Sequence, residues 1–311
     1  MNKILIYSTL IVLLSTLLSA RMDSIDFVPS SQKLSHFMGI RILDVKVLSF
    51  KPKNGIEFTE VSALAYDPKR SRLYGLSDHG YLYHMSVSIK KNRLKKVKLL
   101  EAYTLLDKKG KRLKKSKRDS EGLDVTDKGL VISFEKKPRV SLFSLQGKEI
   151  KEYSLPKKLR KVKHYQDKND ALEAVSVHPK YGLITVPEIP LKKQDEKIHT
   201  LYGKKKKWHF EAKGYIKAIE TMEDGSLLVL EKSFKSSKKR RIVSLTKVNI
   251  NACENSLCPS ETLALFDAKD GWKLDNFEGL TQLEKNRYLM ISDDNGSPKQ
   301  QCIMVLFEIN D

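Results

Sequence analysis

A pattern that occurs five times along the chain limits its possible folds more than any other feature of the sequence. Each copy begins with a strand-like segment, passes through a turn and continues as a second, more apolar strand-like segment that stops at an acidic residue. The copies span residues 60–78, 121–135, 173–188, 217–231 and 278–293. Self-similarity at this interval is typical of folds built from repeated supersecondary units.

The turns inside the copies contain residues suited to hairpins, such as Asp67-Pro68 and Asp224-Gly225, because proline fixes one turn position and glycine accepts a positive φ. A third strand follows most copies, at residues 81–86, 140–145, 242–248 and 303–309. The unit is therefore an antiparallel meander, and repeated meanders bury both of their faces when they pack around a common axis. We predict an all-β fold, a single β-propeller of meander blades.

The number of blades follows less directly from the sequence than the fold does. Five repeats are counted, and a sixth blade could lie in an irregular stretch. A strand at residues 42–50, ahead of the first repeat, could complete the last blade and lock the ring. We expect residues 41–311 to form one propeller domain, with no room for a second domain and with a monomer as the working state.

The amino terminus has the pattern of an export signal. Lys3 precedes an uncharged apolar run over residues 4–20, which ends in small residues before Arg21. We expect residues 1–20 to be a cleaved signal peptide and residues 21–40 to be an amino-terminal linker, which would place the protein in the periplasm or outside the cell. An uncleaved membrane anchor is the alternative. No second long apolar run follows, so no membrane span is expected after signal removal.

An extracytoplasmic location permits disulfides. Cys253 and Cys258 lie five residues apart and are most simply a bridge that closes a loop, which leaves Cys302 as a buried or free thiol.

The chain is strongly basic, with 58 Lys and Arg against 38 Asp and Glu and a formal net charge of +20. Lysines are scattered through expected turns between the apolar segments, in clusters at residues 90–96, 108–117, 204–207 and 235–241. We interpret these clusters as solvated loops, and a role in steering anionic small molecules is the second interpretation. Because stacking aromatics and a reading helix are missing from the pattern, no nucleic-acid partner is expected.

Acidic residues mark the start of the first strand and the end of the second in the repeats. Those two positions lie at the same end of a hairpin, so in a propeller they would surround one mouth of the central channel. Neighbouring carboxylates repel one another unless a cation compensates, and Ca²⁺ takes its oxygen ligands from such clusters. We therefore predict a Ca²⁺ site whose ligands come from Glu60, Asp78, Glu121, Glu135, Glu173, Glu188, Glu231, Glu278, Asp293 and the neighbouring Asp294.

A structural role for these acids is the alternative interpretation. They could accept hydrogen bonds from amides of the next blade or pair with lysines, and repeats can share residues through ancestry alone. Direct acid–base catalysis is a third interpretation. The fourth repeat has Lys217 where the others have glutamate, so Lys217 would either neutralise its acidic neighbours or mark a place for an anion.

Four basic residues are candidates for binding a substrate. His79 follows the acid that ends the first repeat, Arg118 and Arg139 flank the acids of the second, and Lys217 opens the fourth. Arginine can hold a phosphate through two parallel hydrogen bonds. No nucleophile elbow, phosphate-gripping glycine loop or paired-histidine zinc helix is found, so the catalytic residues stay unknown.

Several motifs together resemble one known family. They are residues 119–123 (DSEGL), 169–174 (NDALEA), 227–232 (LLVLEK), and 275–280 (DNFEGL) continuing to 292–295 (SDDN). These stretches resemble the phytase-like family of exported bacterial β-propellers, described as "esterase-like activity of phytase", over roughly residues 40 to 310. The resemblance implies a β-propeller, export and Ca²⁺-assisted hydrolysis of phosphate or other esters. Lys217 and the lysine-rich insertion at residues 108–118 depart from the family pattern.

Two functions of different classes follow from these observations. The first is an exported, Ca²⁺-assisted phosphoesterase or esterase that acts on an anionic small-molecule ester or phosphate at an acidic channel mouth. The alternative is a non-catalytic propeller that binds a ligand, an envelope polymer or a protein partner through its loops.

Overall fold

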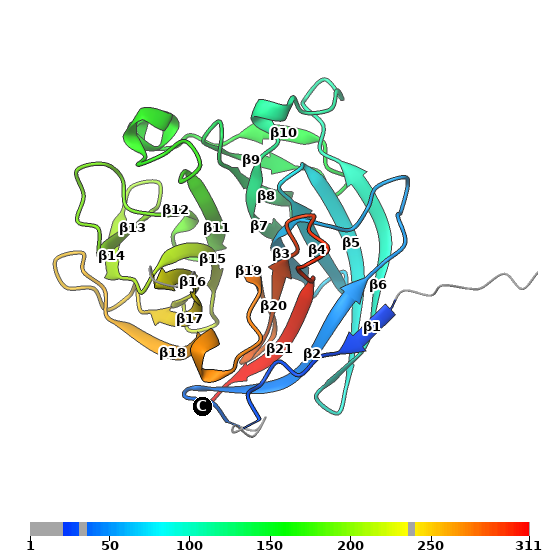
Figure 1. Ribbon diagram of the computed structural model, residues 1–311. Coiled ribbons are helices and arrows are strands. Elements are labelled where there is room, and N and C mark those ends of the chain that lie inside the picture. Colours follow the sequence, from blue (N-terminus) through cyan, green and yellow to red (C-terminus); the bar gives the residue numbers. More distant parts are fainter. Residues whose placement is uncertain (1–20, 31–35, 236–239, 311) are drawn as a thin grey trace, which may run out of the picture.

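A computed structural model shows the protein as a ring of five antiparallel sheets (Figure 1), which confirms the predicted all-β propeller and fixes the number of blades formed by the described residues at five. The structure describes residues 21–30, 36–235 and 240–310. The predicted signal peptide, residues 1–20, lies outside the described residues.

Each of the first four blades is a meander whose strands follow one another from the centre outward. The first blade contains β3 (Val61–Asp67), β4 (Arg72–Ser77), β5 (Tyr81–Lys90) and β6 (Arg93–Thr104). The second contains β7 (Ser120–Thr126), β8 (Gly129–Phe134), β9 (Arg139–Phe143) and β10 (Glu149–Glu152). The third contains β11 (Leu172–His178), β12 (Gly182–Pro187), β13 (Ile198–Tyr202) and β14 (Lys207–Glu211). The fourth contains β15 (Tyr215–Thr221), β16 (Leu227–Lys235), β17 (Arg240–Val248) and β18 (Ser260–Asp267).

The fifth blade combines the two ends of the chain. β19 (Asn276–Glu284), β20 (Arg287–Asp293) and β21 (Ile303–Ile309) are followed by β2 (Ile40–Ser49) and β1 (Arg21–Ser24). β2 pairs antiparallel with β21 over most of its length, and Figure 1 shows blue β2 beside red β21. The prediction that a strand before the first repeat completes the last blade is therefore confirmed.

The innermost strands form a closed ring, because β3 contacts β7, β7 contacts β11, β11 contacts β15, β15 contacts β19 and β19 contacts β3. Glycines allow this close approach. A Cβ atom on Gly122 would lie 2.8 Å from the backbone nitrogen of Val175 on the next blade, and one on Gly279 would lie 3.1 Å from the carbonyl carbon of Ala63. The inner strands therefore bring the first residues of the repeats to one end of the channel.

The blades pack through apolar side chains on both faces. β8 is buried along its whole length, and so is β9 beside it. Short 3₁₀ helices occur only between strands in the described chain, at Lys115–Lys117, Lys157–Arg160, Val162–His164 and Ala268–Asp270. Among the described residues, no helix has the length and apolar character that crossing a bilayer would require.

Two expectations about loops are wrong. Lys95 and Lys96, expected in a solvated loop, lie on β6, an outer strand whose Leu94 and Val97 are buried while the lysines face solvent. In the segment expected as a linker, residues 21–24 form β1 on the edge of the fifth blade. Phe27 of that segment is only 1% exposed, because its ring packs edge-on against Phe266, Trp272 and Phe277.

Candidate functional site

The site is an acidic mouth at the end of the channel where the inner strands begin and the second strands of the blades end. Lys217 lies at its centre. The Lys217 ammonium is 2.5 Å from Oε1 of Glu173, 2.8 Å from Oε1 of Glu188 and 3.5 Å from Oε1 of Glu278. The inner strands of three blades therefore meet at one buried ammonium group.

Burial alone would lower the pKa of Lys217, but the carboxylates of Glu173, Glu278 and Glu188 raise it well above its ordinary value. Burial raises the pKa of Glu173, and the Lys217 charge opposes that rise. Lys217 thus stays charged and neutralises part of the negative charge of the carboxylates around it. Lys217 was expected either to neutralise its acidic neighbours or to mark a place for an anion, and its contacts in the structure are those of the neutralising partner.

A second lysine extends this compensated region towards the fifth blade. The Lys232 ammonium contacts Oδ1 of Asn276 and lies 3.4 Å from Oε1 of Glu278. The amide of Asn276 donates to Glu278 at 2.8 Å and to Asp293 at 3.3 Å. Although burial opposes it, the nearby Lys217 and Lys232 lower the pKa of Glu278, whereas burial and the Glu278 charge raise the pKa of Asp293 to about 8.

On the opposite side of the mouth, acidic side chains outnumber basic ones. Asp119, Glu121 and Glu135 each offer one carboxylate oxygen, and these oxygens lie within 4.8 Å of one another. Glu135 also forms such a group with Glu173 and Glu188. Glu121 makes no hydrogen bond or ion pair with any other described residue, whereas Asp119 accepts from Lys136 at 3.0 Å.

The pKa values on this side reflect both burial and repulsion. Burial and the charges of Glu173 and Glu278 raise the pKa of Glu121 well above its ordinary value. Burial and the neighbouring Asp119 raise that of Glu135 to about 8. These carboxyls therefore hold protons that a cation would displace, and the structure brings together acidic groups that could hold a metal ion.

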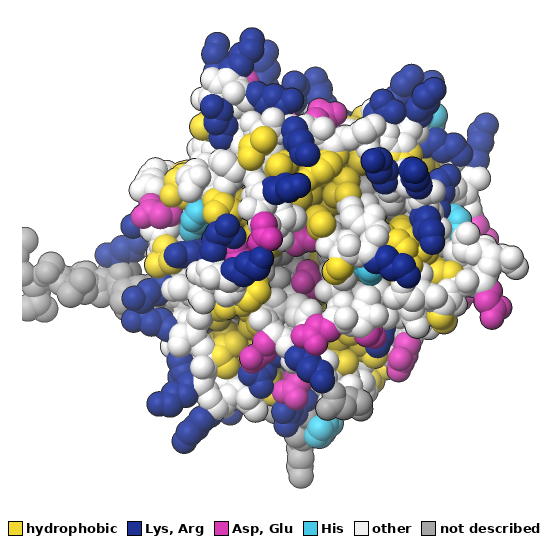
Figure 2. Space-filling view, turned by 180° about the vertical axis from the view of Figure 1, so that it is seen from behind, with side chains coloured by type: hydrophobic (Ala, Val, Ile, Leu, Met, Phe, Trp, Pro, Cys, Tyr) yellow, Lys and Arg dark blue, Asp and Glu magenta, His cyan; other side chains and the backbone are white. Residues whose placement is uncertain are grey.

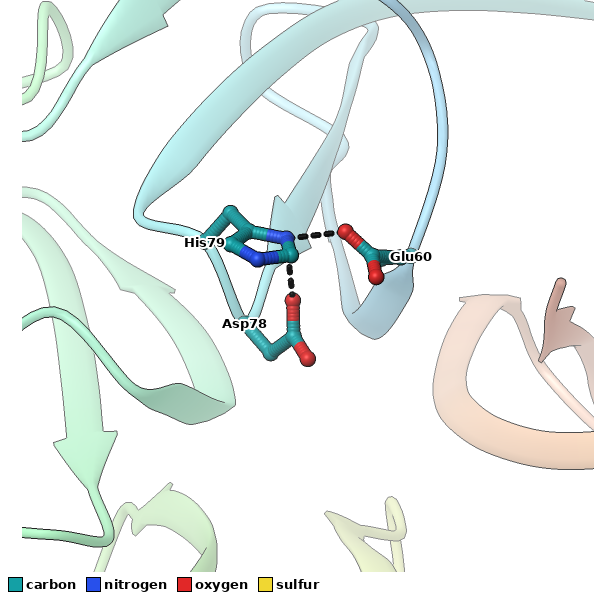
Figure 3. Close-up of side chains that lie close together, drawn as sticks. All are labelled: Glu60, Asp78 and His79. Carbon is teal, nitrogen blue, oxygen red and sulfur yellow. Dashed lines mark ion pairs between the residues drawn. The ribbon is translucent and has the colours of Figure 1, made fainter. Parts of the chain in front are cut away.

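The first blade contributes a third group, drawn in Figure 3. Nδ1 of His79 contacts the carboxylate of Glu60 and lies 3.2 Å from Oδ1 of Asp78. Burial and the Glu60 charge raise the pKa of Asp78 to about 6. A positive φ of 52° at Glu60 turns the chain into β3, and Asp294 holds this turn by accepting hydrogen bonds from the Glu60 N–H at 2.9 Å and the Thr59 hydroxyl at 2.7 Å.

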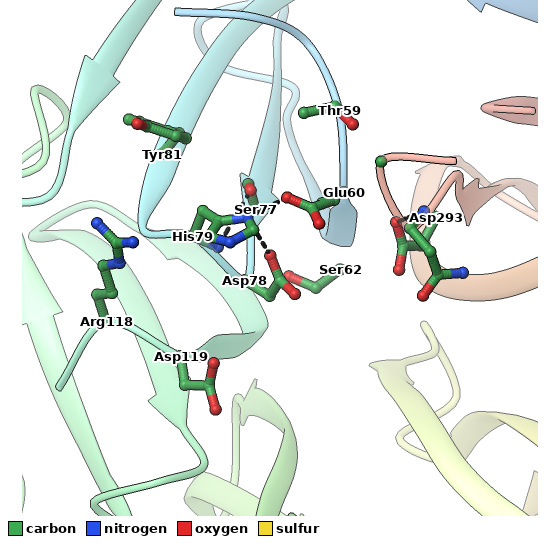
Figure 4. A network of polar contacts seen from close by, with 12 residues as sticks. Thr59, Glu60, Ser62, Ser77, Asp78, His79, Tyr81, Arg118, Asp119 and Asp293 are labelled. Atoms are coloured by element: carbon green, nitrogen blue, oxygen red, sulfur yellow. Dashed lines mark hydrogen bonds and ion pairs between the residues drawn. The ribbon is translucent and has the colours of Figure 1, made fainter. Parts of the chain in front are cut away.

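Figure 4 shows how these groups lie relative to one another. Arg118 and Asp119 approach the His79 turn from the second blade, and Asp293 approaches from the fifth. A Cβ atom on Gly80 would lie 2.9 Å from Cβ of Arg118, so Arg118 packs directly beside the turn that carries His79. Two of the four candidate substrate-binding residues, His79 and Arg118, thus lie at the rim of the acidic mouth.

Three predicted site residues have other tasks. Glu231 is fully buried and its Oε2 accepts from the N–H groups of Lys213 and Gly214, which fixes the loop before β15. Asp294 supports the Glu60 turn. Arg139 places its guanidinium 3.6 Å from the centre of the Phe134 ring and donates to the Lys117 carbonyl at 2.6 Å. Arg139 was expected to bind an anion, but the structure shows it buried as a link between β9 and a loop.

Sequence reasoning missed three members of the mouth. Asp119 precedes the first position of its repeat and was not assigned as a ligand, although it stands two residues before Glu121. Lys232 follows an acid that was assigned, and Asn276 pairs with Asp293 across the β19–β20 ladder. The pairing register of the β19–β20 hairpin is the signal that could have identified Asn276, because it places this residue opposite Asp293.

Cys253 and Cys258 form a disulfide in the described structure, and Cys302 is a buried free cysteine. The bridge closes the loop between β17 and β18, far along the blade from its inner strand. Burial raises the pKa of the Cys302 thiol well above its usual range.

The chain matches the family described as "Phytase-like: Esterase-like activity of phytase" over residues 56–296. This match spans more than half of the chain and includes the inner strands of all five blades. The chain therefore belongs to the phytase-like family.

Among solved structures, similar chains include the hydrazine synthase of Kuenenia stuttgartiensis, with 12% identity and a TM-score of 0.38 over 78% of this chain and 57% of that one. Another is the β-propeller domain of Myceliophteria thermophila Cps50 (Swd1), with 8% identity and a TM-score of 0.40 over 94% of this chain and 100% of that one. This chain thus spans little more than half the length of the hydrazine synthase chain. No curated protein matches it.

Proposed function

We propose that the protein is a Ca²⁺-assisted ester hydrolase that acts on phosphate or other anionic esters at the acidic mouth. The observation that carries this proposal is the carboxylate of Glu121. It is half-buried among other acids, its pKa is raised well above the ordinary value, and it has no hydrogen-bond or ion-pair partner among the described residues.

The donor set favours a hard cation. Asp119, Glu121 and Glu135 provide oxygen atoms only, and Ca²⁺ prefers several oxygen ligands in a flexible arrangement. Glu173 and Glu188 lie next to this group but share the Lys217 ammonium. We therefore assign the cation to the side of the mouth formed by Asp119, Glu121 and Glu135, and we keep Lys217 as the compensating charge on the other side.

A bound Ca²⁺ would polarise the ester and neutralise charge on the substrate. The residues at the rim of the mouth would contact the substrate. Arg118 would contact the anionic part of the substrate, because it lies beside the mouth and carries a forked set of donors. Glu60 and Asp78 hold the His79 ring by Nδ1, so its orientation is fixed next to the same opening.

The surface charge agrees with an anionic substrate. Figure 2 shows one face of the ring, on which Asp and Glu side chains surround a hollowed centre and Lys and Arg side chains project around the rim. A basic periphery attracts anions and raises their rate of encounter with the molecule. We further propose that residues 1–20 direct export to the periplasm or beyond, that the protein works as a monomer, and that it binds no nucleic acid.

The test combines binding with turnover. Purified protein is assayed against p-nitrophenyl phosphate and p-nitrophenyl acetate, with Ca²⁺ and with a chelator, and Ca²⁺ binding is measured by calorimetry. Glu121→Gln should weaken Ca²⁺ binding at least about tenfold and abolish turnover. Glu152→Gln, on exposed strand β10 of the same blade, is the matched control and should change neither.

The outcomes separate the two functions. Ca²⁺ binding that depends on Glu121, without turnover of any ester, would leave a non-catalytic propeller that binds a ligand, an envelope polymer or a protein. Ca²⁺ binding that is absent, or that is unchanged in Glu121→Gln, would remove the metal from the proposal.

A further inference from the structure

A cavity of about 390 Å³ lies between the third and fourth blades, beside the acidic mouth but built from other residues. Its wall includes Gln166, Pro190, Lys197, His199, Lys213 and Tyr215. Pro190 lies two residues after Glu188, and Tyr215 lies two residues before Lys217. The backbone N–H of Ile216 donates to the Glu188 carbonyl at 2.9 Å, which fixes the edge between the cavity and the mouth. The volume is in the range of pockets that hold small molecules.

His199 gives this cavity a polar group that has no hydrogen-bond partner among the described residues. The side chain is on β13 and the residue is only 4% exposed, yet its imidazole makes no hydrogen bond with any described residue. Burial lowers the pKa of His199 to about 4, so the ring is neutral near pH 7 and has one N–H donor and one acceptor. Buried polar groups nearly always have a partner, and one without a protein partner needs an explanation.

The opening of the cavity combines charge with an aromatic surface. Tyr215 is 44% exposed, which is unusual for so large a side chain in this protein. Lys197 and Lys213 line the cavity and are exposed, and neither ammonium forms an ion pair with another described residue. The carboxylate of Glu196 also lines it, so two positive groups and one negative group leave an excess of one positive charge.

We propose that this cavity is a binding site for a small anionic molecule that contains a ring. The ring packs against Tyr215 and Pro190, the anionic group lies between the Lys197 and Lys213 ammonium groups, and a polar atom of the ligand hydrogen-bonds to His199. Aromatic side chains bind planar rings and lysine ammoniums bind anions as point charges. The site uses none of the acidic residues of the mouth, so it does not depend on the proposed hydrolysis.

The probe for this site is phenylphosphonate, because it combines an aryl ring with an anion that cannot be released by ester hydrolysis. Binding to the purified protein is measured by calorimetry, with inorganic phosphate and phenol as probes of the charge and the ring alone. Phenylphosphonate should bind more tightly than either. In ¹H–¹⁵N NMR spectra, its addition should shift the imidazole resonances of His199.

Two substitutions test the assignment to this cavity. Tyr215→Ala and Lys213→Ala change exposed side chains and should each weaken phenylphosphonate binding at least about fivefold. Lys205→Ala, an exposed lysine that does not line this cavity, is the control and should leave binding unchanged. Thermal melting of each variant shows whether the fold is retained.

Several results would overturn the proposal. The first is an absence of binding at millimolar phenylphosphonate, and the second is equal binding of inorganic phosphate and phenylphosphonate. The third is binding that Tyr215→Ala and Lys213→Ala do not weaken. The fourth is binding that leaves the His199 resonances unmoved. The Glu121→Gln variant separates this site from the proposed hydrolysis, because it should lose Ca²⁺ binding and turnover but bind phenylphosphonate with unchanged affinity.

Discussion

The ammonium of Lys217, on the inner strand of the fourth blade, lies 2.5 Å from Oε1 of Glu173, on the inner strand of the third. This contact joins two neighbouring blades at the centre of the ring, where both side chains are almost completely buried. It also divides the acidic mouth into a side where lysine ammonium groups neutralise the carboxylates and a side where acidic side chains outnumber basic ones.

Replacement of Lys217 by methionine should therefore destabilise the protein. Glu173, Glu188 and Glu278 would lose a shared positive partner in a buried place, and removal of one member of a buried charge network costs about 3 kcal/mol. Urea unfolding at neutral pH measures the loss, and added Ca²⁺ should recover part of it, because the released carboxylates can then bind the metal. Lys213→Met, which changes an exposed lysine, should have little effect. Equal stability of Lys217→Met and the unmodified protein would contradict this account.

Stability in the absence of divalent cations should fall as pH rises from about 5 to about 8. The pKa of Glu135 in the folded protein is about 8 against an ordinary value of 4.5, so the folded state binds this proton more tightly than the unfolded chain. The resulting stabilisation is present at low pH and is lost as pH rises through the folded value. We expect a decrease of about 2 kcal/mol in the free energy of unfolding.

Urea unfolding across this pH range, with and without Ca²⁺, checks the prediction. Glu135→Gln should reduce the pH dependence, since glutamine does not titrate, while Glu152→Gln should leave it as it is. Saturating Ca²⁺ should also flatten the profile, because the metal binds the ionised carboxylate. A stability that rises over the same range without metal would show that the sign is wrong.

Arg118 and Arg139 should behave differently although both flank the acids of the second repeat. Arg139→Met removes the stacking on Phe134 and the hydrogen bond to the Lys117 carbonyl, and should cost about 2 kcal/mol of folding stability without changing KM. Arg118→Met should leave the melting temperature almost unchanged and raise KM for an anionic ester. Thermal melts and steady-state kinetics of both variants, side by side, distinguish the two roles. An increase in KM for Arg139→Met alone would reverse the assignment.

The segment before β2 should prove to be part of the fold. Phe27 is 1% exposed and its ring centre lies 5.5 Å from that of Trp272. Phe27→Ala should lower the free energy of unfolding by about 3 kcal/mol, because it opens a cavity in the core of the fifth blade. Met38→Ala, at a position that is 55% exposed, is the control and should change it by less than about 0.5 kcal/mol. Equal effects would mean that this segment contributes little to folding.

The repeat made the propeller and the position of the acidic mouth predictable. The turn residues and the apolar second strands are local signals, and their recurrence fixes which ends of the hairpins meet. The outer strands were harder to predict. β6 carries lysines on its solvent-facing side, so its sequence has the composition of a loop, and β1 is too short to show an alternation of its own.

The chemistry within the mouth depends on distances that a sequence does not contain. Glu231 and Glu188 occupy equivalent repeat positions, yet Glu231 accepts two backbone N–H groups while Glu188 faces Lys217. Arg139 and Arg118 likewise have similar spacing from the repeat acids but point to different partners. Side-chain direction at the end of a strand is set by the neighbouring blade, which is distant in sequence.

The pairing of β2 with β21 has a consequence for biosynthesis. The blade that they share cannot be assembled until the last strand has left the ribosome, so co-translational folding has to stop at an open arc of four sheets. A truncation product that lacks residues 303–309 would leave β2 and β20 as bare sheet edges, which are sites for intermolecular association. Chains of that kind should aggregate or be degraded rather than accumulate as smaller rings.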